Sequence, residues 1–558
     1  MFTIHEGEVI FKEIYGSVKK QRFYVKPPEQ SNVVVVDEEK SNEFTNLFTR
    51  VFLPQGYPYS VSKDYTNYQI WDTAQAFCST ITGILATQEV LRGVGVGDTT
   101  ATPLAATVTW VLKDGCGHLG KIYFAYSHGT HLDAYSKKWR LYADVLNDAA
   151  MCIEIALPAF KNYTTAVLCV STVMKAIVGV AGGATRAAMT QHHAIRSNLA
   201  DVSAKDSAQE TAVNLIASLT ALTIITIFGS SLTVFIIMMV FHIIFNYMAV
   251  RSVCLRTLNK PRLLQIVDTY LREEVIAKPC TVNRNEPVVF FPIGPNTLER
   301  QLCGFQIKIG QSMKKLVNKN PKAYFMINVR GVYKYNEYIL VHCLETRTIY
   351  IYLRETATSD SILCAYFHAM LYGIVICALN DIPLNIYKSP ENLMKPFPVI
   401  CETLKQAEWS RVPIEYAPPY SKFSYEPSFE VMEFLNKIVQ KEWLKLRQGL
   451  KQVGWDLNKN LLIVDEWRIC SAKLVATQIS IGQKVIPKGL AHNDPKIMTF
   501  DVGHEDLAID ELGELRTYTI EPDTENVPEP IIDSEVTQKQ ATMTSSKVGY
   551  NYQIRRLN

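Results

Sequence analysis

The sequence has no motif that marks a metal site, a disulfide framework or a nucleotide-binding loop. Its 12 cysteines include no C-x-x-C pair and no Cys/His cluster at zinc spacing, which indicates reduced thiols of an intracellular protein. The net charge is only +3 without a long basic block, so nucleic acid is not an expected partner. No nucleophile–base pattern is found either, so we expect a non-enzymatic protein without catalytic residues or metal ligands. The sequence does not indicate whether the protein binds a cofactor.

Charge is also absent from one long stretch. No Asp, Glu, Lys or Arg occurs among the 40 residues from Thr211 to Val250, and His242 is the one histidine there. About 18 or more apolar residues without charge predict a transmembrane helix. One helix of this length would measure about 60 Å, roughly twice a bilayer's hydrocarbon core. We expect either two spans broken near Gly229 or one span with a buried extension; the alternative is a buried helix pair of a soluble protein.

The flanks of this run predict its start and its orientation. Ser207 and Glu210 fit a capping box, which predicts a helix start there. Basic residues follow the run, and short basic flanks favour the cytosolic side of a membrane. The first twenty residues match neither a secretory signal nor a transit peptide, so an internal segment is expected to direct insertion. We therefore expect an intracellular membrane of unidentified organelle, with the C-terminal domain on its cytosolic side.

Four regions follow from composition and periodicity. The predicted fold class is a mainly α-helical, membrane-associated N-terminal domain with one to several transmembrane helices, then an α+β soluble domain and a disordered acidic C-terminal tail. A second apolar segment around Lys175 is long enough to span if that lysine reaches the interface. The expected regions are peripheral strands and a linker (1–50), the helical domain with its membrane segment (51–260, with 211–250), the α+β domain (283–480) and the tail (500–558).

Two G-x-x-x-G pairs occur in the helical region. Gly93 with Gly97, and Gly179 with Gly183, are spaced as small residues that let two membrane helices approach closely. We expect both pairs to pack against neighbouring helices.

The second glycine pair adjoins a candidate ligand site. Successive backbone N–H groups at Gly182 and Gly183, with Arg186 nearby, predict an anion nest at a helix N-terminus. Its expected occupant is a phosphorylated small molecule.

Histidines and charged residues separate this site from the long run. His192 and His193 are adjacent, so they should point to different faces of a helix and serve as ordinary hydrogen-bonding side chains. The charged residues between Asp201 and Glu210 predict local ion pairs at the membrane surface, or alternatively a polar pathway.

Several long phrases resemble one known family. They are YPYSVSKDYTNYQIWD, ATQEVLRGVGVGDTTATPLAATVTWVLKDGCGHLG, WRLYADVLNDAAM and GVAGGATRAAMTQHHAIRSNLADVSAKDSAQET. The region from Val51 to Thr257 resembles the root UVB sensitive family, with weaker likeness as far as Arg468. The resemblance implies a role in ultraviolet-B responses, auxin transport or vitamin B6 homeostasis, as in plastid members that act in pairs. It implies no catalytic residues.

We therefore expect a membrane-associated, non-enzymatic protein in small-molecule homeostasis or signalling, with vitamin B6 as the candidate that the family implies. One alternative is a small-molecule transporter or carrier, which needs several spans around a polar path. The other is a scaffold that pairs with a related family member as a hetero-oligomer. The expected partners are a lipid membrane, such a relative and a phosphorylated small molecule.

Overall fold

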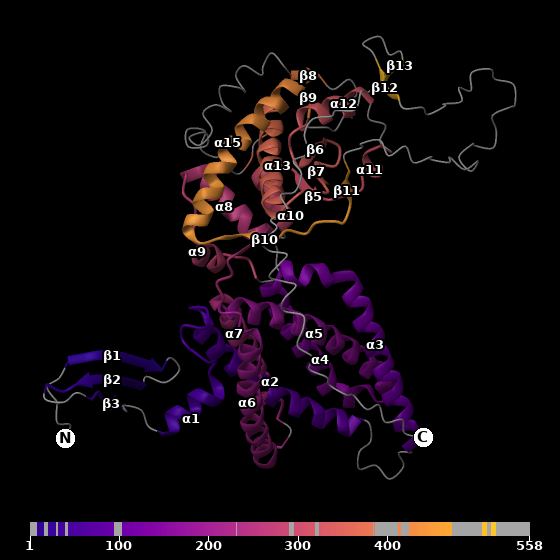
Figure 1. Cartoon of the computed structure of the whole chain (residues 1–558). Helices are drawn as coiled ribbons and strands as arrows, with labels where there is room; N and C mark the ends of the chain where they lie inside the picture. Colours follow the sequence, from indigo (N-terminus) through magenta and orange to yellow (C-terminus); the bar gives the residue numbers. More distant parts are fainter. Residues whose placement is uncertain are drawn as a thin grey trace, which may run out of the picture. The chain divides into compact units, whose positions relative to one another are not determined.

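The computed structural model describes residues 8–15, 20–28, 32–38, 43–93, 103–229, 231–288, 295–317, 323–382, 384, 411–413, 423–470, 505–509 and 515–519. Contacts divide the chain into a first unit, Met1–Cys470, and a second, Ser471–Asn558. Figure 1 shows long helices in the indigo to purple part of the first unit, and strands with further helices in its magenta to orange part.

The chain begins with a small antiparallel sheet. Its strands β1 (Glu8–Tyr15), β2 (Lys20–Lys26) and β3 (Val34–Glu38) pair in chain order. Strands are thus present in the region where the sequence predicted them.

Long helices then fill the region from residue 43 to residue 252. They are α1 (Glu43–Phe52), α2 (Tyr65–Gly93), α3 (Pro103–Ala134), α4 (Ser136–Ile155), the 3-10 turn η1 (Leu157–Tyr163), α5 (Thr164–His193), α6 (Leu199–Phe228) and α7 (Leu232–Ser252).

The uncharged run forms two helices, as expected both for two spans and for a buried helix pair, and not one continuous helix. The break is at Gly229, whose φ of +67° suits glycine best, and the side chain of Ser231 caps the second helix by accepting from the Val234 N–H. The predicted start at Ser207 is wrong, because α6 begins at Leu199 and Ser207 lies inside it. The charged residues of this segment therefore lie on the first turns of α6.

Helices α5, α6 and α7 are long and apolar enough to cross a membrane, and so is α13 (Ser359–Leu379) of the second half. The 18-residue apolar window of α13 is 89% buried, whereas that of α6 is only 11% buried. Helix α13 is thus the core helix of a folded domain. By contrast, α6 and α7 expose large apolar side chains, among them Leu219, Leu222, Ile237 and Phe241.

Helix α6 carries several threonines without leaving their hydroxyls unpaired. Thr220, Thr223 and Thr226 each donate to the carbonyl four residues earlier, at 2.8–2.9 Å. Such bonds let a threonine face an apolar surrounding. The buried residues Ala217 and Ala221 pack in a core with residues of α2, α4 and α7.

The second half is an α+β domain around one mixed sheet, as predicted. Strand β7 lies between β6, which is antiparallel to it, and β5, which is parallel to it, and β11 also pairs with β7. Helix α13 and its neighbours pack on these strands in one large core. In chain order, the described elements of this half besides α13 are β4 (Thr257–Asn259), α8 (Lys260–Glu273), α9 (Pro279–Arg284), α10 (Pro295–Cys303), β5 (Gln306–Ile309), α11 (Lys314–Val317), α12 (Ala323–Val332), β6 (Tyr338–Cys343), β7 (Thr348–Arg354), β8 (Arg411–Pro413), β9 (Tyr425–Pro427), α15 (Phe429–Val453), β10 (Asp456–Leu461) and β11 (Arg468–Ile469).

The acidic tail was predicted to be disordered. In the second unit the structure describes one antiparallel hairpin, β12 (Glu505–Ile509) with β13 (Leu515–Thr519), which that prediction did not include. The rest of the predicted tail lies outside the described residues.

Candidate functional site

One face of α4 carries ionisable side chains into the helical bundle. Arg140, Asp144 and Asp148 are spaced four residues apart, so they lie on one face of the helix. This face meets α2 and α7, which contribute polar side chains of their own. We call the set the polar seam, and its members are Asp72, Gln75, Arg140, Asp144, Asp148, His242 and Asn246.

His242 is fully buried at the centre of the polar seam. Its Nδ1 lies 2.9 Å from both carboxylate oxygens of Asp148, and its Nε2 lies 2.9 Å from Oε1 of Gln75. The Gln75 amide nitrogen faces Asp72, which leaves its oxygen for the histidine. Both partners of the ring present acceptor oxygens, so the site suits an imidazole that donates from both nitrogens.

The other members continue the polar seam along α4. Arg140 donates to Asp72 Oδ1 at 2.9 Å, and its Nε lies 4.0 Å from Asp144 Oδ2. Asn246 donates to Asp144 at 2.5 Å, and its own Oδ1 is buried without a hydrogen-bond partner among the described residues.

A second group of charges adjoins the polar seam. Arg186 forms ion pairs with Asp206, at 2.8 Å, and with Glu210, while Gln69 donates to the other oxygen of Asp206 at 3.0 Å. The predicted local ion pairing is wrong for Asp206 and Glu210, because both residues of α6 pair with Arg186 of α5.

The predicted anion nest has a different setting in the structure. Gly182 and Gly183 lie in the interior of α5, where backbone N–H groups bond to the preceding turn, so they are not at a helix N-terminus. Arg186 lies one turn further on, and its guanidinium is already paired with two carboxylates. The backbone N–H groups of Gly182 and Gly183 are therefore not free to bind the predicted anion.

The predicted packing glycines also differ from the expectation. A Cβ added at Gly179 or Gly183 would meet nothing within 4 Å, so neither residue is at a close helix contact. Gly93 ends α2 and lies against the side chain of Leu157, while Gly97 lies outside the described residues.

One close helix approach that the sequence did not identify is between α3 and α5. Cβ atoms at Gly117 and Gly120 of α3 would lie 2.9 Å from Thr172 and 3.1 Å from Val173 of α5. Only a hydrogen at these two positions lets the helices come this close.

A small cavity connects the polar seam to the Arg186 group. Its volume is about 70 Å³, which gives room for a few water molecules. Its walls carry two guanidinium groups, from Arg140 and Arg186, and three carboxylates, from Asp72, Asp206 and Glu210. The charge on its walls is thus net negative, which favours a proton, a cation or a neutral solute over a phosphate.

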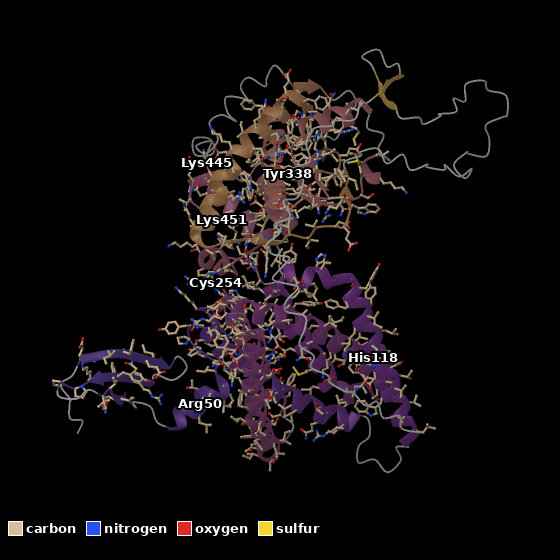
Figure 2. The ribbon with its side chains drawn as sticks, in the orientation of Figure 1. Arg50, His118, Cys254, Tyr338, Lys445 and Lys451 are labelled. Carbon is tan, nitrogen blue, oxygen red and sulfur yellow. The ribbon has the colours of Figure 1, made fainter. Side chains whose placement is uncertain are left out.

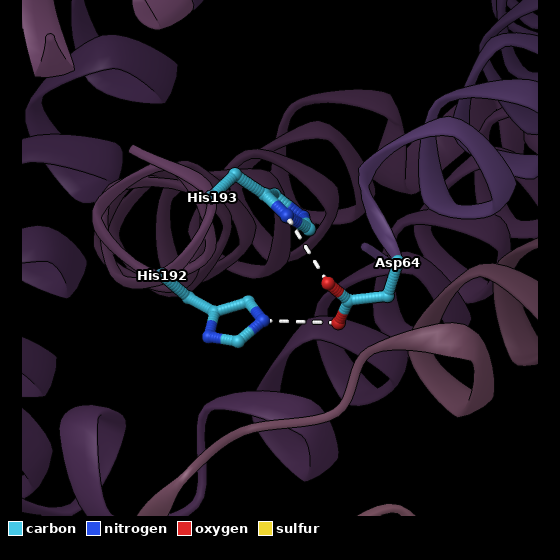
Figure 3. Close-up of side chains that lie close together, drawn as sticks. All are labelled: Asp64, His192 and His193. Atoms are coloured by element: carbon cyan, nitrogen blue, oxygen red, sulfur yellow. Dashed lines mark hydrogen bonds and ion pairs between the residues drawn. The ribbon is translucent and has the colours of Figure 1, made fainter. Parts of the chain in front are cut away.

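A separate cluster ties the loop before α2 to the end of α5, and Figure 3 shows its three side chains. His192 Nε2 lies 2.9 Å from Asp64 Oδ2, and His193 Nδ1 lies 3.9 Å from Asp64 Oδ1 and 2.6 Å from Ser62 Oγ. The backbone N–H of Cys254, which Figure 2 labels after α7, donates to the same carboxylate at 2.6 Å. Both histidines are hydrogen-bonded, as expected.

The expectation that the two histidines point apart is wrong, because both converge on Asp64 (Figure 3). Burial raises the pKa of Asp64, but the hydrogen bond and charge of His192, with further donors, outweigh it and hold that pKa well below its usual value. Asp64 is therefore an anion between two imidazoles. These three side chains are the described group whose donor atoms suit a metal ion.

Sequence reasoning missed most of the polar seam. His242 was visible as the one histidine in the run, but its partners lie on α2 and α4, far away in sequence. The signal that could have found them is the i, i+4, i+8 spacing of Arg140, Asp144 and Asp148.

Comparisons with known proteins match most of the chain. The model described as the vitamin B6 photo-protection and homoeostasis domain matches residues 38–274, and the model described as the root UVB sensitive protein C-terminal domain matches residues 275–471. No solved structure gives a significant match.

Curated relatives come from a slime mould and a plant. The chain is 44% identical over 260 residues to RUS family member 1 of Dictyostelium discoideum, covering 45% of this chain and 49% of that protein. It is 30% identical over 418 residues to protein root UVB sensitive 3 of Arabidopsis thaliana, covering 72% of this chain and 92% of that protein. It is 29% identical over 367 residues to the Arabidopsis protein root UVB sensitive 2, chloroplastic, covering 64% of this chain and 79% of that protein. With both domain models matched and one relative covered almost end to end, the chain belongs to the root UVB sensitive (RUS) family.

Proposed function

We propose that this protein is a non-enzymatic membrane carrier for a small polar molecule of the vitamin B6 type, with the polar seam as its transport path. The observation that carries the proposal is the buried pair that His242, on the candidate span α7, forms with Asp148 of α4. The description of the family's first domain supplies the class of solute.

Membrane insertion of α5, α6 and α7 is supported by length and exposure. Helix α7 has 21 residues, or about 31 Å, which matches the hydrocarbon core of a bilayer. Leu215, Leu222, Ile227 and Phe228 of α6 are each more than half exposed. In water such a surface would favour aggregation, whereas lipid would cover it.

The free-energy cost of burying the polar seam supports its proposed role as a transport path. Burying ionisable groups away from water is expensive unless they are paired, and a core that served only for stability would be apolar. Here α2, α4 and α7 all contribute charged or amide side chains to one buried seam. Such rows in membrane proteins line the routes of protons and solutes.

The charges of the cavity indicate which form of the solute is carried. With three carboxylates and two guanidinium groups in its walls, the cavity suits the unphosphorylated vitamers pyridoxine and pyridoxamine better than pyridoxal phosphate. Its volume of about 70 Å³ is too small for these rings, so a solute enters only when α2 and α6 move apart. The pairing of His242 with Asp148 suits proton coupling, since a proton can pass between a carboxylate and an imidazole.

Uptake by proteoliposomes tests the proposal. Purified full-length protein is reconstituted, and the uptake of radiolabelled pyridoxine, pyridoxamine and pyridoxal phosphate is measured with and without an imposed pH gradient. We expect the unphosphorylated vitamers to accumulate, and we expect Asp148→Asn and His242→Gln to lose at least about tenfold of the rate. The matched control is Asp268→Asn, which removes an exposed carboxylate of α8 and should leave uptake unchanged.

Two results would reject the proposal. One is uptake no faster than in empty liposomes for all three compounds. The other is equal uptake by Asp148→Asn, His242→Gln and Asp268→Asn. Preferential uptake of pyridoxal phosphate would still show a carrier. It would contradict the inference that the negatively charged cavity disfavours a phosphorylated solute.

A further inference from the structure

We propose that Asp64, His192 and His193 form a binding site for one divalent transition-metal ion, with Zn²⁺ as the first candidate. This site lies apart from the polar seam, and the inference does not depend on the transport proposal. It rests on the convergence of two imidazole nitrogens and one carboxylate from segments 128 residues apart in the chain.

The donor set suits such an ion. One ligand atom from each residue lies within 4.8 Å of the other two. Two imidazoles and one carboxylate form a three-residue set that leaves a further position open, as in many zinc and non-haem iron sites. Ser62 Oγ, at 2.6 Å from His193 Nδ1, is an additional oxygen at the same place.

Adjacent histidines of a helix rarely share a ligand, because their side chains leave the axis about 100° apart. Here α5 ends at His193, and the two rings use different atoms to reach the same point. His192 approaches with its distal nitrogen, Nε2, and His193 with its proximal nitrogen, Nδ1. The unequal reach of these two atoms compensates for the angle between the side chains.

Binding of an ion requires the three ligand atoms to move closer together. Tetrahedral coordination at about 2.0–2.1 Å places neighbouring ligand atoms about 3.3 Å apart. The pair formed by His192 Nε2 and Asp64 Oδ2 is at 2.9 Å, and that formed by His193 Nδ1 and Asp64 Oδ1 is at 3.9 Å. These two contacts use different oxygens of Asp64, so the three ligand atoms, which lie within 4.8 Å of one another, must draw together by up to about 1.5 Å around an ion. The ion would replace the proton that His192 now donates to Asp64.

The surroundings hold the three side chains in place. The ring of His193 packs against Tyr65 and Tyr68, with centroids 5.5 and 5.0 Å away, and is 2% exposed. His192 also lines a cavity of about 580 Å³, which gives an ion a path to the cluster.

Cobalt titration of the full chain tests the site. The protein is purified in detergent with a tag that contains no histidine, stripped with chelator, and titrated with Co²⁺, whose visible bands report coordination; Zn²⁺ is then added to displace it. We expect about one equivalent bound by nitrogen and oxygen donors. We also expect Asp64→Asn and His192→Gln to bind at least about tenfold more weakly. His118→Gln, which removes an exposed histidine of α3, should bind like the wild type.

Folding is controlled within the same experiment. Asn at position 64 keeps an oxygen for the Cys254 N–H, and circular dichroism of the stripped proteins checks that the helices are intact. The wild type alone can also overturn the proposal, by binding no cobalt or by showing a sulfur-to-cobalt charge-transfer band, which would place the ion on cysteine. Equal affinity of Asp64→Asn and His118→Gln would overturn it as well.

Discussion

The guanidinium of Arg262 donates to Glu286 Oε2 at 2.9 Å, and this buried bond joins the part of the chain matched by the first family model to the part matched by the second. Lys137 lies 3.8 Å from the same oxygen, and Asn259 donates to the other. Burial raises the pKa of Glu286, but its two cationic neighbours outweigh it and lower that pKa. Burial lowers the pKa of Lys137 to about 8.

We expect Glu286→Ala to destabilise the protein severely, by roughly 3–5 kcal/mol, because it leaves Arg262 and Lys137 buried without their counter-charge. Glu286→Gln should cost less, since it keeps an acceptor. The measurement is thermal unfolding followed with a thiol-reactive dye, which reports the buried Cys303, Cys364 and Cys377. The control is Glu433→Ala.

Glu433 pairs with Lys437 at 2.9 Å on the surface of α15, where ion pairs contribute little. If Glu286→Ala unfolds at the same temperature as Glu433→Ala, the Arg262–Glu286 bond is not a structural joint.

The buried His342 predicts acid sensitivity of the α+β domain. Burial lowers its pKa to about 4, and its Nδ1 lies 2.7 Å from the Tyr372 hydroxyl. In the unfolded chain the pKa is about 6.5, so the unfolded state binds the proton first as the pH falls. Stability is therefore present above pH 6.5 and is lost progressively between 6.5 and 4, by about 3 kcal/mol from this residue.

Thermal unfolding across this pH range checks the prediction. We expect His342→Gln to have a shallower loss of stability between pH 6.5 and 4 than the wild type, whatever its stability at neutral pH. His118→Gln, which lacks an exposed histidine instead, should follow the wild type. Parallel curves for all three proteins would show that His342 does not stay neutral in the fold.

The pair formed by His242 and Asp148 predicts non-additive effects on stability. His242→Leu leaves a buried carboxylate without its partner, and Asp148→Leu leaves a buried imidazole without its counter-charge; each should cost roughly 3 kcal/mol. The double Leu variant removes both charges and should be more stable than either single variant. Unfolding temperatures of the four proteins in one detergent measure the coupling, and additive losses would contradict a direct pair.

Local patterns were sufficient to predict some elements that depend on neighbouring residues. The absence of charge predicted the apolar helices of this run, with a break near Gly229 as one of the expectations. The helix start at Ser207 was wrong because a good capping box can lie inside a helix when packing extends the helix beyond it. Arg140 and Asp144 look like an ordinary polar face until α2 and α7 are placed against them. Contacts between segments far apart in the chain, such as that of Asp64 with His192, produce no periodic pattern in the sequence, so they could not be predicted from it.

A glycine within a helix either permits close packing of a neighbouring helix or only lowers helix stability. Gly117 and Gly179 are one example of each. At Gly179 of α5 an added methyl group meets nothing within 4 Å, so Gly179→Ala should stabilise the protein by up to about 1 kcal/mol through helix propensity. At Gly117 of α3 the same methyl group would lie 2.9 Å from Thr172, so Gly117→Ala should destabilise it as α3 is pushed off α5. Unfolding temperatures of the two variants should therefore move in opposite directions from the wild type. A gain at both positions would mean that α3 and α5 do not pack closely at Gly117, and a loss at Gly179 would instead support the helix contact that its G-x-x-x-G spacing with Gly183 predicted.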